Sequence, residues 1–324
     1  MPRRPLPGGA ATLVCLAAGL GARPSAAQGL PPYASMNPMV FSRTGLATQP
    51  YVAPGRRWRV GVLLDYASPI EYTSTPQVFY VMDAELLRLQ LTVTREVGKN
   101  AFVLAEGSFN AAYDGFLDGF LQWYHDLVGL QVAARKIRPR NSFDYELDLA
   151  DGRHFTYTKS SGYLGDLRLG LGARHSRHWQ TVASVTLPTS GGPDGFTRGV
   201  VSANATTMLR SDFWKRFTWE GSVGAGYTPT HGDLADLQHT TFLMVSQGVR
   251  ARVAGPLHLY TNAIYHSPLY HDTGTSELDA HELTIDSGGF FKFKRGPEWM
   301  AGLTEDLKPS GPAIDLSFRF GARW

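Results

Sequence analysis

Apolar and polar positions alternate along most of the chain, and the alternation is clearest at its end. In residues 313–324, apolar side chains occupy every second position, and the positions between them are polar, charged or small. The apolar positions are Ile314, Leu316, Phe318, Phe320, Ala322 and Trp324. Successive side chains of a β-strand point to opposite faces, so this pattern predicts a strand with one apolar and one polar face.

Similar segments of strand length recur between about residues 57 and 306, and the gaps between them alternate in length. Short gaps fall near 97–100, 175–177, 211–214, 254–256 and 294–296, and long ones near 67–79, 113–162, 188–197, 228–237 and 268–280. Outer-membrane barrels have short turns on one side and longer loops on the other. The pattern predicts an all-β chain, a transmembrane antiparallel up-and-down β-barrel of about 12 strands over residues 57–324. A hairpin near 143–157 would raise the number to about 14 if it joined the wall.

One segment does not fit a single lipid-facing side. In the strand expected at about 80–95, Asp83 and Glu85 share the parity of the leucines that follow them. A charged side chain carried into hydrocarbon costs free energy. We therefore expect a β-bulge near Leu86–Leu87 that turns the face, and we favour it over a position of both acids above the lipid.

The longest interruption, residues 113–162, is predicted to be an extracellular insertion with an amphipathic helix at 114–129. Apolar residues follow Asp114 at helical spacing, and Gly129 is a suitable C-terminal stop. We expect this helix to be a lid or plug of the barrel mouth. Asp118 and His125 are two turns apart and share a face, where they would anchor the helix or bind a ligand.

Residues 1–27 have the features of a signal peptide, with Arg3 and Arg4 before an apolar core and small residues before Gln28. We expect residues 28–56, which are rich in proline, to form an irregular lead-in at the periplasmic mouth. The formal charge of +3 comes from arginines within residues 1–27, so a nucleic-acid partner is not expected. Cys15 is the only cysteine, and the histidines lack metal-site spacing, so no metal and no cofactor are expected.

Several segments resemble a known family of bacterial outer-membrane proteins, domain of unknown function 3187. These segments are Asn37–Met39, Met82–Arg88, Gly115–Leu130, Gly165–Leu167, Leu187–Thr189 and Thr304–Leu307. The helical segment 115–130 is the most specific of them, and Ala84 and Val128 depart from the family pattern, which has glycine and phenylalanine there. The resemblance implies an outer-membrane barrel and implies no activity.

Charged residues on the polar parity of the strands and on the helix are the candidate lumen or lid residues. They are Asp83, Glu85, Arg88, Asp118, His125, Asp166, Arg168, Glu220, Asp286, Asp306, Asp315 and Arg319. We interpret the strand charges as a salt-bridge network of the lumen, and we predict no catalytic residue.

The function that these observations favour is an outer-membrane protein that passes or binds a small solute. The expected partners are the membrane lipid, the solute, and the barrel-assembly machinery, which would engage the last strand ending at Trp324. Two alternatives remain. The first is a lipid-modifying enzyme, suggested by His175–Ser176, although the pair falls in a short turn and lacks a third member. The second is a structural barrel with a plugged lumen.

Overall fold

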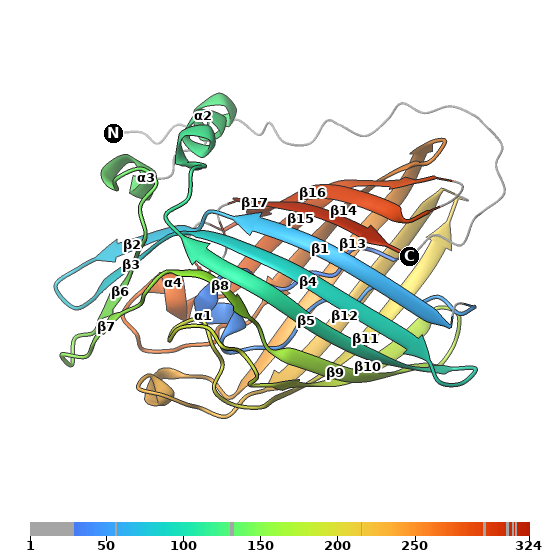
Figure 1. Cartoon of the computed structure of the whole chain (residues 1–324), viewed down its shortest axis with the longest axis horizontal. Coiled ribbons are helices and arrows are strands. Elements are labelled where there is room, and N and C mark those ends of the chain that lie inside the picture. Colours follow the sequence, from blue (N-terminus) through green and yellow to red (C-terminus); the bar gives the residue numbers. More distant parts are fainter. Residues whose placement is uncertain are drawn as a thin grey trace, which may run out of the picture.

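The computed structural model describes residues 29–55, 57–129, 133–214, 216–293, 296–308, 311–312, 314 and 316–324. Within these residues, twelve antiparallel strands close into a barrel (Figure 1). The strands are β1 (Trp58–Ala67), β4 (Glu85–Glu96), β5 (Ala101–Tyr113), β9 (Leu167–Arg174), β10 (Trp179–Leu187), β11 (Ser202–Phe213), β12 (Phe217–Tyr227), β13 (Thr241–Ala254), β14 (Leu257–His266), β15 (Glu282–Lys292), β16 (Glu298–Asp306) and β17 (Leu316–Arg323). The predicted barrel and its lower strand number are confirmed.

The last strand closes the barrel by pairing with the first. Leu64 of β1 lies opposite Phe320 of β17, and the other edge of β1 pairs with β4. The final amide, Trp324 N–H, donates to the Val60 carbonyl at 2.9 Å. Closure leaves no free sheet edge, so the strand main chains satisfy one another without water, as a membrane requires.

The alternation of side chains follows from the pleat. In β11, buried and exposed residues alternate from Ser202 to Leu209. Side chains that face away from the lumen are largely apolar and exposed: Leu89, Leu91, Val103, Leu169, Leu171, Val185, Leu209, Val223, Leu243, Val245, Leu259, Phe291, Trp299, Leu303 and Phe320. The opposite face carries buried polar and charged residues, as expected of a barrel that faces lipid outside and a polar lumen inside.

The two ends of the barrel differ. The end with the short connections, here called the turn end, holds the C-terminus, and the end with the long connections is called the loop end (Figure 1). Exposed aromatic side chains gather near the turn end, at Trp58, Trp179, Trp214, Phe293, Trp299 and Trp324. Aromatic residues are enriched at membrane interfaces, so these side chains mark one edge of the lipid-facing band.

A second sheet extends from the loop end. It contains β2 (Ile70–Ser74), β3 (Phe79–Asp83), β6 (Asp144–Asp148) and β7 (His154–Thr156), in that order. The hairpin of the long insertion therefore pairs with β3 and adds nothing to the barrel wall. Strand β8 (Ser160–Leu164) pairs with the end of β5.

The expected bulge near Leu86–Leu87 is wrong, because β4 pairs in continuous register with both β1 and β5. The chain instead leaves one sheet and enters the other at Ala84. Asp83 thus ends a strand of the second sheet, whereas Glu85 begins a barrel strand on its outer face.

The helical segments are short. They are α1 (Pro38–Phe41), α2 (Asp118–Val128), α3 (Ala133–Ile137), the 3₁₀ turn η1 (Ala235–Leu237) and α4 (Ser276–Asp279). None of the helices in the described ranges has the length and apolar character needed to cross a membrane.

Candidate functional site

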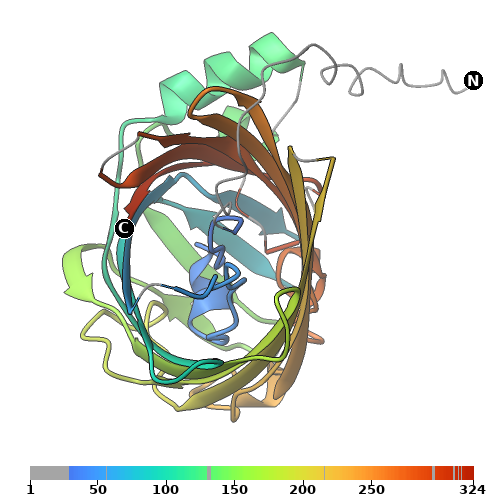
Figure 2. The same cartoon turned by 90° about the vertical axis from the view of Figure 1, so that its right-hand side faces the viewer.

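Residues 29–55, here called the lumen segment, lie inside the barrel (Figure 2). The segment begins near the turn end, where Arg323 donates to the Gly29 carbonyl at 2.7 Å. It reaches the loop end at Arg43, whose guanidinium donates to the Thr228, Pro229 and His239 carbonyls. It then returns towards the turn end to enter β1. The expected resting place at the periplasmic mouth is therefore wrong, because the segment runs the length of the lumen and back.

Helix α1 forms the turning point of the lumen segment. Asn37 caps it, with its Oδ1 accepting from Met39 N–H at 2.9 Å, and Pro38 occupies the first helical position, where a missing N–H costs nothing. The Asn37 Nδ2 donates to Glu71 of β2 at 2.7 Å. The tip of the lumen segment is thereby joined to the second sheet.

Glu71 is buried at this contact and also accepts from the Tyr80 hydroxyl at 2.6 Å. Burial raises the pKa of the Glu71 carboxyl well above its ordinary value, and the nearby acid Glu277 adds to the rise. The charged form is disfavoured because a low-dielectric site solvates it poorly.

Besides Arg59 of β1, which donates to the carbonyl of the nearby Ala53, six arginines of the barrel strands and loops donate to main-chain carbonyls of the lumen segment. The pairs are Arg88 with Ala34 and Ser35, Arg168 with Gly45, Arg174 with Val52, Arg198 with Phe41 and Thr44, Arg319 with Pro32, and Arg323 with Gly29. The lumen segment contains little helix or strand, so most of its main-chain carbonyls need hydrogen-bond donors from other parts of the chain. A guanidinium provides five N–H donors.

Each of the six arginines also has a carboxylate partner on the wall. The pairs are Arg88–Asp65, Arg168–Glu106, Arg174–Glu96, Arg198–Asp166, Arg319–Asp286 and Arg323–Glu298. The wall charges are therefore compensated within the wall, and the lumen segment supplies carbonyls in addition.

Arg319 is the most enclosed member of this set. Its Nε lies 2.9 Å from Asp65 and its Nη1 lies 2.6 Å from Asp286, and the three side chains are at most 1% exposed. Arg88 approaches Asp65 from the other side at 2.9 Å. The four charges lie on inward positions of β1, β4, β15 and β17. The barrel closure places Asp65 opposite Arg319, and Arg319 reaches Asp286 across β16.

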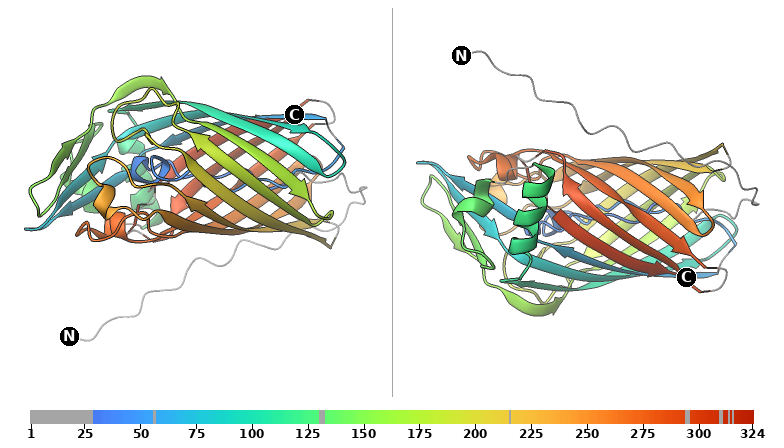
Figure 3. Two further views of the ribbon diagram at one scale, coloured as in Figure 1. Left: turned by 90° about the horizontal axis from the view of Figure 1, so that it is seen from below. Right: turned by 90° about the horizontal axis from the view of Figure 1, so that it is seen from above.

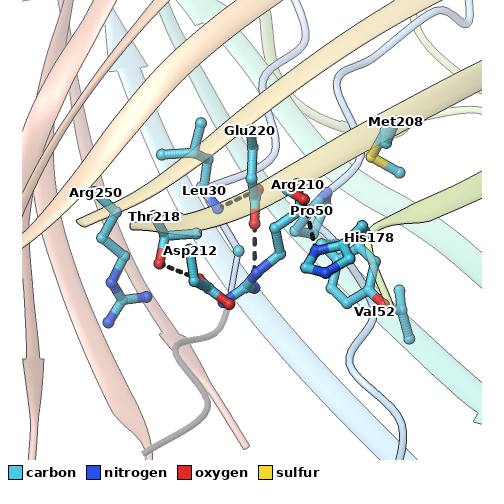
Figure 4. Close-up of polar contacts among 12 residues, drawn as sticks. Leu30, Pro50, Val52, His178, Met208, Arg210, Asp212, Thr218, Glu220 and Arg250 are labelled. Carbon is cyan, nitrogen blue, oxygen red and sulfur yellow. Dashed lines mark hydrogen bonds and ion pairs between the residues drawn. The ribbon is translucent and has the colours of Figure 1, made fainter. Parts of the chain in front are cut away.

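A second cluster lies nearer the turn end (Figure 4). Arg210 contacts Glu220 at 3.3 Å, and Glu220 accepts from the Leu30 N–H at 2.8 Å. Arg210 also lies 3.1 Å from Asp212. In this cluster the main chain of the lumen segment is bound by a carboxylate of the wall, that of Glu220, whereas the six arginines bind it elsewhere.

Among the described residues, two of the cavities between the lumen segment and the wall are larger than about 20 Å³. One, of about 220 Å³, lies beside β1 and β4 and is lined largely by apolar atoms, among them those of Pro50, Val52 and Leu63. The other, of about 100 Å³, lies beside β4, β5 and β9 nearer the loop end. Glu106 lines both cavities, and its carboxylate lies 3.7 Å from Arg168. The two cavities therefore meet at Glu106.

The structure places the predicted site residues in three groups. Arg88, Arg168, Glu220, Asp286 and Arg319 lie in the lumen, and Asp166 pairs with Arg198 towards the loop end. Asp83 contacts Ser142 in the second sheet, Asp118 pairs with Arg135, His125 is buried on α2, and Asp306 accepts from the Lys308 N–H. Asp315 lies outside the described residues.

Helix α2 lies outside the barrel, although we expected it to be a lid or a plug of the mouth (Figure 3). Phe120 contacts Phe318 of β17, with ring centroids 5.9 Å apart, and the Tyr124 hydroxyl donates to Glu305 of β16 at 3.3 Å. Glu85 accepts from the Phe116 N–H at 2.6 Å and also from the Leu117 N–H. The acid that appeared misplaced in the sequence thus satisfies free amides at the start of the helix.

His175 and Ser176 lie in an exposed turn between β9 and β10, and His175 contacts the Thr181 hydroxyl and the Trp179 ring. In the part of the chain that the structure describes, no group of three or more metal-ligating side chains occurs.

Sequence reasoning did not single out several residues of the lumen. These are Tyr33, Glu96, Glu106, Arg198, Arg210, Arg250 and Glu298. Their position on the polar parity of predicted strands was a usable signal for most of them. No comparable signal existed for Tyr33, which lies in the lumen segment.

Comparisons with known proteins agree with this architecture. A family model described as "Protein of unknown function (DUF3187)" matches residues 66–324, which confirms the resemblance found in the sequence. No curated protein matches the chain.

Solved structures with a similar fold include the COG4313 outer membrane channel from Pseudomonas putida F1, with a TM-score of 0.50 and 10% identity over 84% of this chain and 99% of that one. The NanC porin matches with a TM-score of 0.47 and 8% identity over 81% of this chain and 98% of that one. The first match shows that the fold is that of an outer-membrane barrel.

Proposed function

The chain belongs to the DUF3187 family, and from that premise we propose that it passes a small solute across the outer membrane beside a movable lumen segment. A barrel of this fold, lipid-facing outside and polar inside, supports the location. The similar structure from Pseudomonas putida F1 is described as a channel, and we extend that role to this chain as part of the proposal.

The observation that carries the proposal is the pair of cavities that share Glu106. They lie along one side of the lumen segment, against β4 and β5, and together they follow the wall from the turn-end half towards the loop end. The smaller cavity, of about 100 Å³, has room for only about three waters at their liquid volume. A solute larger than that requires the tip of the lumen segment to move.

The way in which the lumen segment is held favours such movement. If it withdraws, the six arginines lose carbonyl partners, and each keeps its wall carboxylate. Water can replace a carbonyl acceptor at a small net free energy, whereas an unpaired buried charge would cost several kcal/mol, about 3–5 by the usual range. The segment can therefore leave the wall without leaving an unpaired charge behind.

A disulfide that locks the tip to the wall tests the proposal. A Cβ placed on Gly45 would lie 3.0 Å from the Cβ of Thr186 on β10, slightly closer than the about 3.8 Å typical of a disulfide. The variant Gly45→Cys/Thr186→Cys, in a Cys15→Ser background, should conduct ions or admit small solutes into vesicles when reduced and lose that activity when oxidised. The single variant Thr186→Cys, treated with the same oxidant, is the control.

Equal activity of the oxidised and reduced forms would show that the tip does not gate passage. The absence of any conductance or uptake, in wild type and reduced variant alike, would overturn the transport proposal. It would favour the alternative of a plugged structural barrel, which the filled lumen and the apolar cluster at the loop end support. That alternative also predicts no conductance after deletion of residues 113–162.

We further propose that residues 1–27 direct export and that the barrel-assembly machinery recognises the last strand. Support for the second point comes from the aromatic side chain of Trp324 on the lipid-facing parity of β17. Deletion of Trp324 should lower the yield of assembled barrel in outer-membrane fractions without lowering synthesis of the chain.

A further inference from the structure

An apolar stripe that the described part of the chain covers only in part runs along α2 and the turn before it. Phe116, Phe120, Trp123 and Leu127 are 43–68% exposed. Spacings of three and four residues place Phe120, Trp123 and Leu127 on one side of the helix, and Phe116 lies just before it. Leu121 and His125, on the opposite side, are buried. Large apolar side chains exposed together on one helix face indicate an interaction surface.

The helix is fixed against the outside of the wall. Glu85, on the outer face of β4, accepts from two amides just before the helix, and the Phe116 ring lies 5.7 Å from that of Tyr66 on β1. Arg135 of α3 contacts Asp118 at 2.7 Å and donates to the Ser68 carbonyl at 2.8 Å. These contacts hold α2 against the wall, where Phe116 and Phe120 of the stripe touch β1 and β17 and Trp123 and Leu127 stay largely exposed.

The level of α2 on the barrel follows from β1. Trp58 belongs to the aromatic edge at the turn end, and Tyr66, which touches Phe116, is eight residues further along the strand. Eight residues span about 26 Å along a strand, or about 20 Å along the membrane normal at the tilt usual for such barrels. The lipid-facing band is about 25 Å tall, so α2 lies close to its far edge.

We infer that α2 is an interfacial helix, whose stripe of Phe116, Phe120, Trp123 and Leu127 is buried among the acyl chains of the outer leaflet just below the headgroups. Helix α2 lies beside β16 and β17 (Figure 3), and the exposed apolar residues of these strands include Leu303 and Phe320. Interfacial helices bury an apolar face about 5–10 Å into the boundary between headgroups and acyl chains. The inference rests on the proposed outer-membrane location, and it is independent of whether a solute passes.

Site-directed spin labelling of the full chain in phospholipid vesicles tests the inference. A nitroxide is attached at Leu127→Cys, with Cys15→Ser to remove the other thiol. Leu243→Cys on the lipid face of β13 is the lipid control, and Asp151→Cys in the exposed hairpin between β6 and β7 is the water control. Accessibility to oxygen, which favours acyl chains, is compared with accessibility to a polar nickel chelate.

The expected ratio of oxygen to nickel accessibility at Leu127 is clearly above that at Asp151 and close to that at Leu243, which lies eight residues from the turn-end residue Ala251 and so at about the level of Tyr66. A ratio at Leu127 equal to that at Asp151, with Leu243 in lipid, would overturn this inference and leave the proposed function standing. A ratio at Leu243 equal to that of the water control would overturn the membrane location itself, and with it the proposed function.

Discussion

Replacement of Arg319 by leucine should destabilise the barrel strongly. Asp65 would keep Arg88 at 2.9 Å, whereas Asp286 would keep only the Tyr260 hydroxyl at 3.1 Å among its contacts in the described lumen. Asp286 is fully buried, so its charge would lose the guanidinium that now lies 2.6 Å away. Removal of one partner of a buried pair costs about 3–5 kcal/mol, and we expect a loss of that size.

The measurement is the free energy of unfolding in urea, followed by tryptophan fluorescence of the protein in lipid vesicles. The double variant Arg319→Leu/Asp286→Asn removes the orphaned charge and should regain part of the loss, about 1–3 kcal/mol. Arg153→Leu is the control, because its partners Asp151 and Asp236 are exposed and such pairs contribute little.

A loss with Arg319→Leu no larger than with Arg153→Leu would refute the reasoning, because it would mean that Asp286 is hydrated in the folded barrel. A double variant no more stable than the single one would refute the assignment of the loss to Asp286. The remaining explanation would then be the lost contacts to the lumen segment.

Three further variants test other parts of the structure. Burial raises the pKa of the Glu71 carboxyl, so the folded state keeps a proton that the unfolded chain releases above about pH 4.3. The free energy of unfolding should therefore fall as the pH rises above that value. The variant Glu71→Gln should remove this part of the dependence of the unfolding free energy on pH. Gly115 has φ +77°, and a Cβ there would lie 1.9 Å from the Cδ of Glu85. The variant Gly115→Ala should therefore detach the start of α2 and raise the nickel accessibility of a spin label on α2. The control Gly98→Ala, where a Cβ would meet open space, should leave that accessibility unchanged. Val223→Arg places a charge on the lipid face of β12 and should lower the free energy of unfolding in vesicles by about 2–4 kcal/mol. The secondary structure of the folded protein in the same vesicles should change little.

The barrel could be predicted from the sequence because lipid and lumen impose a period of two on every wall strand. The alternation in residues 313–324 and the alternating gap lengths carry that constraint directly. The break at Ala84 escaped prediction because Asp83 and Glu85 have the same parity in two different sheets. Parity within one segment cannot reveal that the segment changes partners.

The helix was predictable, although it begins at Asp118 and not at Asp114, and its position was not predictable. A stripe at helical spacing indicates that one face of α2 meets an apolar surface. The stripe does not tell whether that surface is the rim of the barrel or a lipid leaflet, because either could accept apolar side chains. Its position depends on Glu85, whose role requires the main-chain amides of residues 116 and 117 to come close in space. The lumen segment escaped prediction for a similar reason, since its main-chain carbonyls bind the wall and side-chain patterns do not show them.

The two classes of contact made by the lumen arginines have different consequences for function. The ion pairs lie within the wall, so loss of Arg319 should lower stability whether or not the lumen segment moves. The carbonyl contacts cross from wall to segment, so a lock at Gly45 and Thr186 should affect passage and leave the ion pairs intact. Because each arginine serves both partners, the wall can remain folded while the segment exchanges its acceptors for water. A stable wall around a separately attached segment is what a gated passage requires, and the two sets of variants perturb these two properties separately.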